Sequence, residues 1–235
     1  TELRGETHNL YAAWRILVEA HDVERLKTGL PAVILYKVMN DHRIEMQEFT
    51  GLLLDMVSWL QSAQSSQDAQ SAQDAAASVL PESLPSRTAI SELYALTLAA
   101  YRHFAIDYSR PQPTFPYHEK SQELIRDLPE SSSKAFVLLL NSIGPGILNR
   151  SAVIETAQQS CTIFSRLNDT WGSALAQMIC ADGNTFGTQE YGLARSEYQA
   201  SLERFTQLEN DWGRALCING LSYVEQKTGN LGKAF

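Results

Sequence analysis

The sequence has few cysteines and no long apolar segment. Cys161, Cys180 and Cys217 are odd in number and far apart, with no Cys-x-x-Cys pair. This pattern argues against a disulfide framework or a zinc finger and favours buried small hydrophobes in a reducing compartment. The longest apolar runs, residues 32–36 and 135–140, are too short to cross a bilayer, and the charged N-terminus is no signal peptide. We therefore expect a cytoplasmic protein with no membrane partner.

The sequence also lacks an excess of positive charge. Lys and Arg total 19 against 27 Asp and Glu, which leaves a formal net charge of −8. An acidic chain repels phosphate, so direct binding of nucleic acid is not expected. Hydrophobic residues make up 44% of the 235 residues, which is too many for a disordered chain and enough for a sizeable core.

Signatures of catalysis and of metal binding are missing. The chain has no Gly-x-x-x-x-Gly-Lys-Ser/Thr loop and no Gly-x-Ser-x-Gly elbow. His42-x-x-Glu45 lacks the second His of a zinc helix, so Glu45 better fits a surface ion pair. We read His103 as a core or rim residue, and Asp127 and Glu130 as helix-end charges. The sequence thus predicts no catalytic residue, no metal and no cofactor in this segment.

Helical periodicity, in contrast, is present almost everywhere. Apolar residues recur at spacings of three and four, with short polar breaks at His21-Asp22 and Asn40-Asp41. Such short connections imply antiparallel helix neighbours, and hence an all-α fold. Pro31 lies within the second apolar stripe, where it either kinks the helix or marks its true start with Thr28 as the N-cap.

Composition divides the chain into three parts. Residues 61–74 are low in complexity and carry no large apolar side chain, so we read residues 63–86 as a linker. It separates an N-terminal helical segment, residues 1–62, from a helical repeat array over residues 87–235. Within the array, breaks are expected at a proline-rich loop and at clusters of Asp, Asn, Ser, Gly and Pro, namely 109–117, 128–131, 144–146, 168–169, 182–184, 210–211 and 229–230.

An internal repeat is the most informative feature of the array. Residues 160–175 and 201–216, which are 41 residues apart, are identical at seven of sixteen positions. A period of this length with two helices per unit is typical of an α-solenoid, in which stacked helix pairs bury faces that no single pair can bury. The repeated residues are predicted to be structural: Phe164 and Phe205 close one helix, Trp171 and Trp212 open the next, Gly172 and Gly213 leave room where helices meet, and Leu167 and Leu208 pack the helix end.

The array resembles tetratricopeptide repeats (TPR) in Tyr191-x-x-Ala194-x-x-x-Tyr198-x-x-Ser201-Leu202 and in Gly229-Asn230-Leu231-x-x-Ala234. It departs from them in its longer unit and in Ser222, where Gly is usual. The longer unit at 201–216, together with Asn9-Leu10-x-Ala12-Ala13-Trp14 and Leu30-Pro31, is similar to the sensor arrays of bacterial signal-transduction ATPases with numerous domains (the STAND class).

These resemblances imply a right-handed superhelix whose concave groove binds a protein or a small-molecule inducer. They place Asn219, Tyr223, Gln226 and Lys227 in that groove, with Asp182 and Asn184 as their equivalents one unit earlier. A STAND array would hold an attached nucleotide-binding domain inactive until its ligand binds; a free-standing interaction adaptor is the alternative. The absence of an initiator Met and the final helical pattern suggest a fragment, which we expect to be monomeric.

Overall fold

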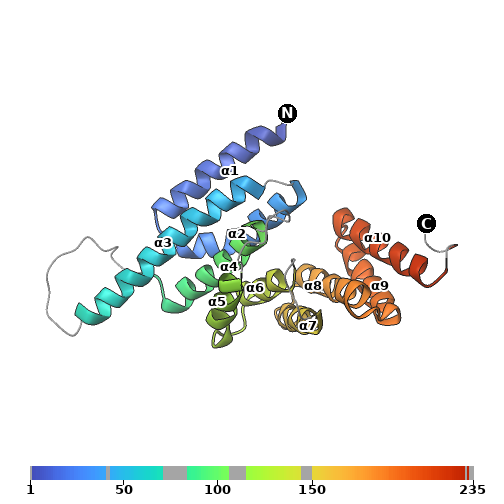
Figure 1. The fold of residues 1–235 in the computed structure, drawn as a ribbon. Coiled ribbons are helices and arrows are strands. Elements are labelled where there is room, and N and C mark those ends of the chain that lie inside the picture. The colour runs from blue at the N-terminus through green and yellow to red at the C-terminus, as the bar shows by residue number, and fades with distance from the viewer. Residues whose placement is uncertain are drawn as a thin grey trace. The chain divides into compact units, whose positions relative to one another are not determined.

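The computed structural model describes residues 2–40, 43–70, 84–105, 115–143, 150–230 and 232, and over these residues it is helical with no strand (Figure 1). This agrees with the predicted all-α class. Its elements are α1 (Glu2–Glu19), α2 (Val23–Asn40), α3 (Arg43–Gln70), α4 (Arg87–Ala105), α5 (Phe115–Arg126), α6 (Ser132–Ser142), α7 (Arg150–Arg166), α8 (Thr170–Asp182), the π-helix η1 (Gly183–Thr188), α9 (Tyr191–Gln207) and α10 (Asp211–Lys227).

The chain forms two compact units, Thr1–Leu128 and Pro129–Phe235. The first is built around α4, which packs against α2, α3 and α5 and buries side chains on nearly all of its faces. A half-buried Lys27 ammonium on α2 pairs with the buried Glu92 carboxylate on α4 at 2.8 Å. A buried charge needs such a partner because burial removes its hydration.

The predicted linker begins inside a helix. α3 continues past residue 62 to Gln70, and residues 71–83 lie outside the described residues. The hydroxyls of Ser62, Ser65 and Ser66 each donate to the carbonyl four residues earlier, and Gln64 Nε2 donates to the Pro85 carbonyl at 2.9 Å. The helix before the predicted linker, α3, packs against the helix after it, α4, so the two belong to one compact unit. Once the apolar part of a helix is held by packing, adding further residues costs little, so the helix can continue into a polar stretch such as this one.

Pro31 lies inside a continuous helix. α2 begins at Val23, and the carboxylate of Asp22 accepts from the Arg25 amide at 3.1 Å, which is the bond of an N-cap. Thr28 does not cap a helix, because its hydroxyl donates backwards to the Glu24 carbonyl at 2.8 Å. Of the two alternatives for this segment, the later start at Thr28 is therefore wrong.

In the second unit, helices from α6 to α10 pack in chain order, so that α7 contacts α6 and α8, and α9 contacts α8 and α10 (Figure 1). The turns before α8 and α10 share one geometry. Asn168 and Glu209 adopt positive φ angles of 57° and 53°. The side chains of the following residues, Asp169 and Asn210, cap the next helix by accepting from the amides of Gly172 and Gly213.

The repeated glycines lie under the repeated phenylalanine rings. A Cβ added to Gly172 would stand 2.5 Å from the Phe164 ring, and one added to Gly213 would stand 2.5 Å from the Phe205 ring. Both rings are buried, whereas Leu167 and Leu208 remain 41% and 40% exposed. The leucines therefore close the helix ends less completely than predicted, because each is followed by the positive-φ residue that turns the chain away.

The break predicted at residues 182–184 is wrong. Gly183 has ordinary right-handed helical angles (φ −58°, ψ −45°), and α8 runs directly into the π-helix η1. The chain turns only at Gln189, where φ is 61°, and the Glu190 amide donates to the Asn184 carbonyl at 2.9 Å. Asn184 and Thr185 are buried, so packing holds this segment helical despite its turn-forming composition.

Candidate binding surface

Four of the predicted binding residues lie together on α10. Asn219, Tyr223, Gln226 and Lys227 are spaced by three, four or one residues, which places them on one side of the helix. Asn219, Gln226 and Lys227 are exposed, and Tyr223 is half-buried. The structure therefore presents these side chains as a continuous polar and aromatic strip that a ligand can reach.

Phe186 joins this strip and was missed in the sequence. Its side chain is 52% exposed, and its ring centroid lies 4.9 Å from that of Tyr223. The Lys227 Nζ atom lies 5.2 Å from the centroid of the Tyr223 ring on the same helix. We call Phe186, Asn219, Tyr223, Gln226 and Lys227 the α10 ledge. Periodicity could not reveal Phe186, because η1 departs from the period of an α-helix.

The α10 ledge can bind but carries no set of groups for catalysis. Two aromatic rings offer apolar surface, and Lys227 offers a positive charge that the Tyr223 ring stabilises. Amides such as those of Asn219 and Gln226 pair with peptide groups as both donors and acceptors. This combination suits a peptide or helix surface, and it includes no nucleophile beside a base.

Asp182 and Asn184 lie away from this strip, where their side chains form hydrogen bonds with residues of α9. The Tyr198 hydroxyl donates to the Asp182 carboxylate, and Asn184 Nδ2 donates to Glu197 Oε2 at 2.8 Å. Burial raises the pKa of Asp182 and of Glu197, in each case against the lowering effect of these hydrogen bonds. Both residues join α8 and η1 to α9, so the structure does not bring them to the α10 ledge.

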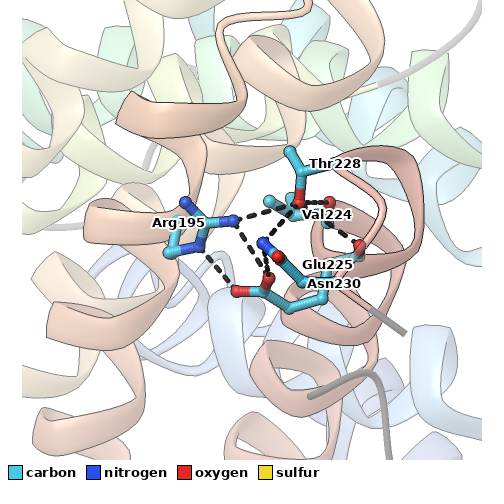
Figure 2. Close-up of polar contacts among 5 residues, drawn as sticks. All are labelled: Arg195, Val224, Glu225, Thr228 and Asn230. Atoms are coloured by element: carbon cyan, nitrogen blue, oxygen red, sulfur yellow. Dashed lines mark hydrogen bonds and ion pairs between the residues drawn. The ribbon is translucent and has the colours of Figure 1, made fainter. Parts of the chain in front are cut away.

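The C-terminal end of α10 is held by the polar network of Figure 2. Arg195 of α9 donates to both carboxylate oxygens of Glu225, from Nε at 2.6 Å and from Nη2 at 3.0 Å, and the same Nη2 also donates to the Thr228 hydroxyl at 3.1 Å. The hydrogen bond to Glu225 raises the pKa of Arg195. Asn230 donates to the same carboxylate at 2.9 Å. Because Glu225 is buried, this bidentate pair ties α10 to α9 and orients the ledge.

The remaining candidates fit structural roles. Trp171 and Trp212 are half-buried at the starts of α8 and α10. The three cysteines are free thiols, and burial raises the pKa of each, so none is activated as a nucleophile.

His103, which the sequence predicts to be a core or rim residue, packs edge-on against Phe104, with ring centroids 5.1 Å apart. His42 and the Glu45 side chain lie outside the described residues. Among the residues that are described, no group of three or more His, Cys, Asp or Glu side chains could hold a metal ion. Within the same residues, every helix is too short or too polar to span a bilayer.

Comparisons with known proteins add nothing to the resemblance to TPR and STAND arrays, which rests on the sequence motifs alone. No protein-family model, curated protein or solved structure matches the chain. The assignment of function therefore rests on the repeat and on the α10 ledge.

Proposed function

We propose that this chain is a helical-repeat scaffold that binds a protein or small-molecule ligand through the α10 ledge. The observation that carries the proposal is the contact between the exposed Phe186 ring and the half-buried Tyr223 ring beside Lys227. Aromatic side chains and a cation gathered on one face are typical of interaction surfaces rather than of a solvated helix. The helix pairs of the second unit would stack as a right-handed, TPR-like superhelix.

In its cellular role the scaffold is the sensor array of a STAND-type ATPase. The support for this role is the resemblance of residues 201–216 and of the N-terminal segment to such arrays. The array would hold an attached nucleotide-binding domain inactive, and ligand binding would release it. A free-standing interaction adaptor uses the same ledge without an attached switch, and it is the second candidate because the ledge alone favours neither one.

The coding sequence upstream of Thr1 separates these two candidates. A Gly-x-x-x-x-Gly-Lys-Ser/Thr motif between a strand and a helix there supports the sensor role, because that loop cradles nucleotide phosphates. ATP hydrolysis by the encoded protein would then be compared with that of a form lacking residues 1–235, which should be more active. A coding sequence without the motif contradicts the sensor role and leaves the adaptor.

The ledge itself is tested by Asn219→Ala and Tyr223→Ala in the encoded protein. Both side chains reach solvent, so the fold should persist while ligand binding weakens. Circular dichroism checks the fold, and titration with the ligand checks affinity. Unchanged affinity in a folded double variant would remove the ledge from the binding surface.

A further inference from the structure

A groove lies between α7 and α9, with residues of α8 at its base. Both α7 and α9 pack on α8, and the groove has a volume of about 670 Å³, which is in the range of ligand-binding clefts. Most of its lining is polar, with amides, hydroxyls and charged groups from Gln158, Thr162, Ser165, Arg166, Gln177 and Glu197. Helices of the same unit lie before and after these three, so the groove is an internal surface of the array.

The contact of α7 with α6 gives a reference for this groove, because the same hydrogen bond joins α7 to α6 and α9 to α8. The Ser160 hydroxyl of α7 donates to the Ala135 carbonyl of α6 at 2.7 Å, and the Ser201 hydroxyl of α9 donates to the Ala174 carbonyl of α8 at 2.8 Å. Both bonds are buried, so they hold the two helix pairs in the same register. Residues at equal sequence distances from these serines and alanines can therefore be compared.

Three residues after the alanine and the serine, the two helix pairs differ in polarity. The α6–α7 pair carries Leu138 and Ile163, which are both buried. The α8–α9 pair carries Gln177 and Arg204, and the Arg204 guanidinium donates to the side-chain oxygen of Gln177. Because one repeat fills these positions with apolar side chains, the fold itself does not require a charge at Arg204. A polar pair at positions that suit apolar residues indicates a role other than packing.

Two opposite charges lie at different places along the groove. Arg204 is bonded to Gln177, and the Glu197 carboxylate accepts from Asn184 Nδ2 at 2.8 Å. Arg204 and Glu197 are seven residues apart on α9, and their partners Gln177 and Asn184 are also seven residues apart on α8 and η1. At a helical rise of about 1.5 Å per residue, the two charges are therefore separated by about 10 Å along the groove.

Neither of these charges is neutralised by a side chain of opposite charge. Both side chains are half-buried, and over the described residues each is bonded to an uncharged amide and takes part in no ion pair. Arg166 of the same groove, in contrast, is paired with Glu130 at 2.5 Å. Cys161, which lines the groove, is affected by both charges: burial raises the pKa of its thiol, Arg204 lowers it and Glu197 raises it further. Half-buried charges without counter-ions have lost part of their hydration and favour a ligand that supplies the opposite charges.

We propose that this groove binds a short peptide of about three residues with free termini, whose ammonium group pairs with Glu197 and whose carboxylate pairs with Arg204. An extended chain advances about 3.3–3.6 Å per residue, so three residues span the separation of the two charges. The side chains of Gln158, Thr162 and Ser165 lie along the groove, where they can pair with the peptide groups between the termini. This site is separate from the α10 ledge, so it goes beyond the proposed function and does not depend on it.

Trialanine is the probe for this site, because its side chains are small and its binding depends mainly on its termini. It is titrated into the isotope-labelled full chain, and the backbone amide signals are followed by NMR. We expect saturable shifts of signals from α7, α8 and α9. Acetylating the amino terminus or amidating the carboxyl terminus should each weaken binding about tenfold, because each removes one charge-assisted hydrogen bond. Dialanine, which is too short to reach both charges, should also bind more weakly.

Variants of the chain assign each terminus to its partner. Glu197→Gln keeps an oxygen that accepts from Asn184 but removes the negative charge, so it should no longer distinguish free from acetylated trialanine. Arg204→Gln should no longer distinguish free from amidated trialanine. Glu203→Gln changes an exposed carboxylate on the same helix and should leave affinity unchanged. Circular dichroism confirms that the variants fold.

Three outcomes overturn the proposal: no saturable shift with trialanine, equal affinity for the free and blocked peptides, or shifts confined to helices other than α7, α8 and α9. If a charge variant fails to fold, the comparison of free and blocked peptides on the unchanged chain still decides. Asn219→Ala and Tyr223→Ala should leave trialanine binding intact, so failure at this groove is distinct from failure of the α10 ledge.

Discussion

The two helix pairs α7–α8 and α9–α10 share their turns but differ where their helices cross. In α9–α10, the fully buried Tyr198 ring lies over Gly220, where an added Cβ would stand 2.3 Å from the ring. The equivalent positions in α7–α8 hold Ala157 and Ile179, both buried. In α7–α8 the first helix carries the small residue, Ala157, and the second carries the large one, Ile179. In α9–α10 the order is reversed, because the first helix carries Tyr198 and the second carries Gly220.

The difference teaches what a repeat conserves. The turn is repeated because its backbone geometry, with one positive φ angle before a capping Asp or Asn, has few alternatives. Where the two helices cross, the repeat keeps only the total side-chain volume. Close packing constrains the combined volume of the two side chains and not the volume of each one.

The largest expected effect breaks the crossing of α9 and α10. Tyr198→Ala should destabilise the second unit by about 3–5 kcal/mol through the cavity it leaves, and Gly220→Ile should destabilise it through collision with the ring. Together they reproduce the pair Ala157 and Ile179, so the double variant should be less destabilised than the sum. Urea unfolding measures the free energies, and hydrogen exchange of α9 amides localises them. Strict additivity would show that the two positions do not share one volume.

A smaller effect is expected under the phenylalanine rings. Gly213→Ala should cost about 1–3 kcal/mol, because the new methyl group meets Phe205 and the ring has to shift. Gly192→Ala on α9 is the control: nothing lies within 4 Å of the added Cβ, so it should stabilise the helix by about 0.5–1 kcal/mol. Thermal unfolding of both variants makes the comparison. Equal shifts in melting temperature would contradict the close approach of Gly213 to the ring.

Replacing the positive-φ residue of each turn by glycine should change stability by an amount that depends on the residue replaced. Glu209→Gly is expected to stabilise the chain by up to about 1 kcal/mol, since glycine adopts the left-handed region without a steric penalty. Asn168→Gly should gain less, because asparagine tolerates this region better than glutamate. Chemical unfolding of the two variants provides the test, and a larger gain at Asn168 would be inconsistent with the shared turn.

The smallest effect concerns pH. Burial raises the pKa of Asp182 above its ordinary value of 3.8, against the lowering effect of the Tyr198 hydrogen bond. The contribution of Asp182 to the free energy of unfolding is therefore fully present below about pH 3.8, and it is lost as the pH rises through the higher pKa of the folded state. Asp182→Asn keeps an acceptor for Tyr198 and removes the titration, so its melting temperature should fall less between about pH 4 and 7. An identical pH profile for both proteins would mean that Asp182 is not titrating in this range.

Much of the fold, but only part of the site, could be predicted from the sequence. The breaks at His21-Asp22, Asn168-Asp169 and Asn210-Asp211 follow from local capping chemistry, and the structure confirms them. The break at 182–184 could not be excluded locally, because Gly183 and Asn184 favour a turn until burial holds them helical. The residues of the strip on α10 that we propose to bind a ligand came from the resemblance, but Phe186 came only from the structure.

What the sequence by itself determined is the helical class, the 41-residue period and the capped turns before α2, α8 and α10, because these depend on side chains and backbones a few residues apart. What only the tertiary structure decided is which equivalent positions are covered. Ala174 and Ala215 are the same residue at the same place in the repeat, yet one is buried under α9 and the other faces solvent. Exposure depends on the neighbouring helix and not on the residue, so a repeat pattern cannot locate its own open surface.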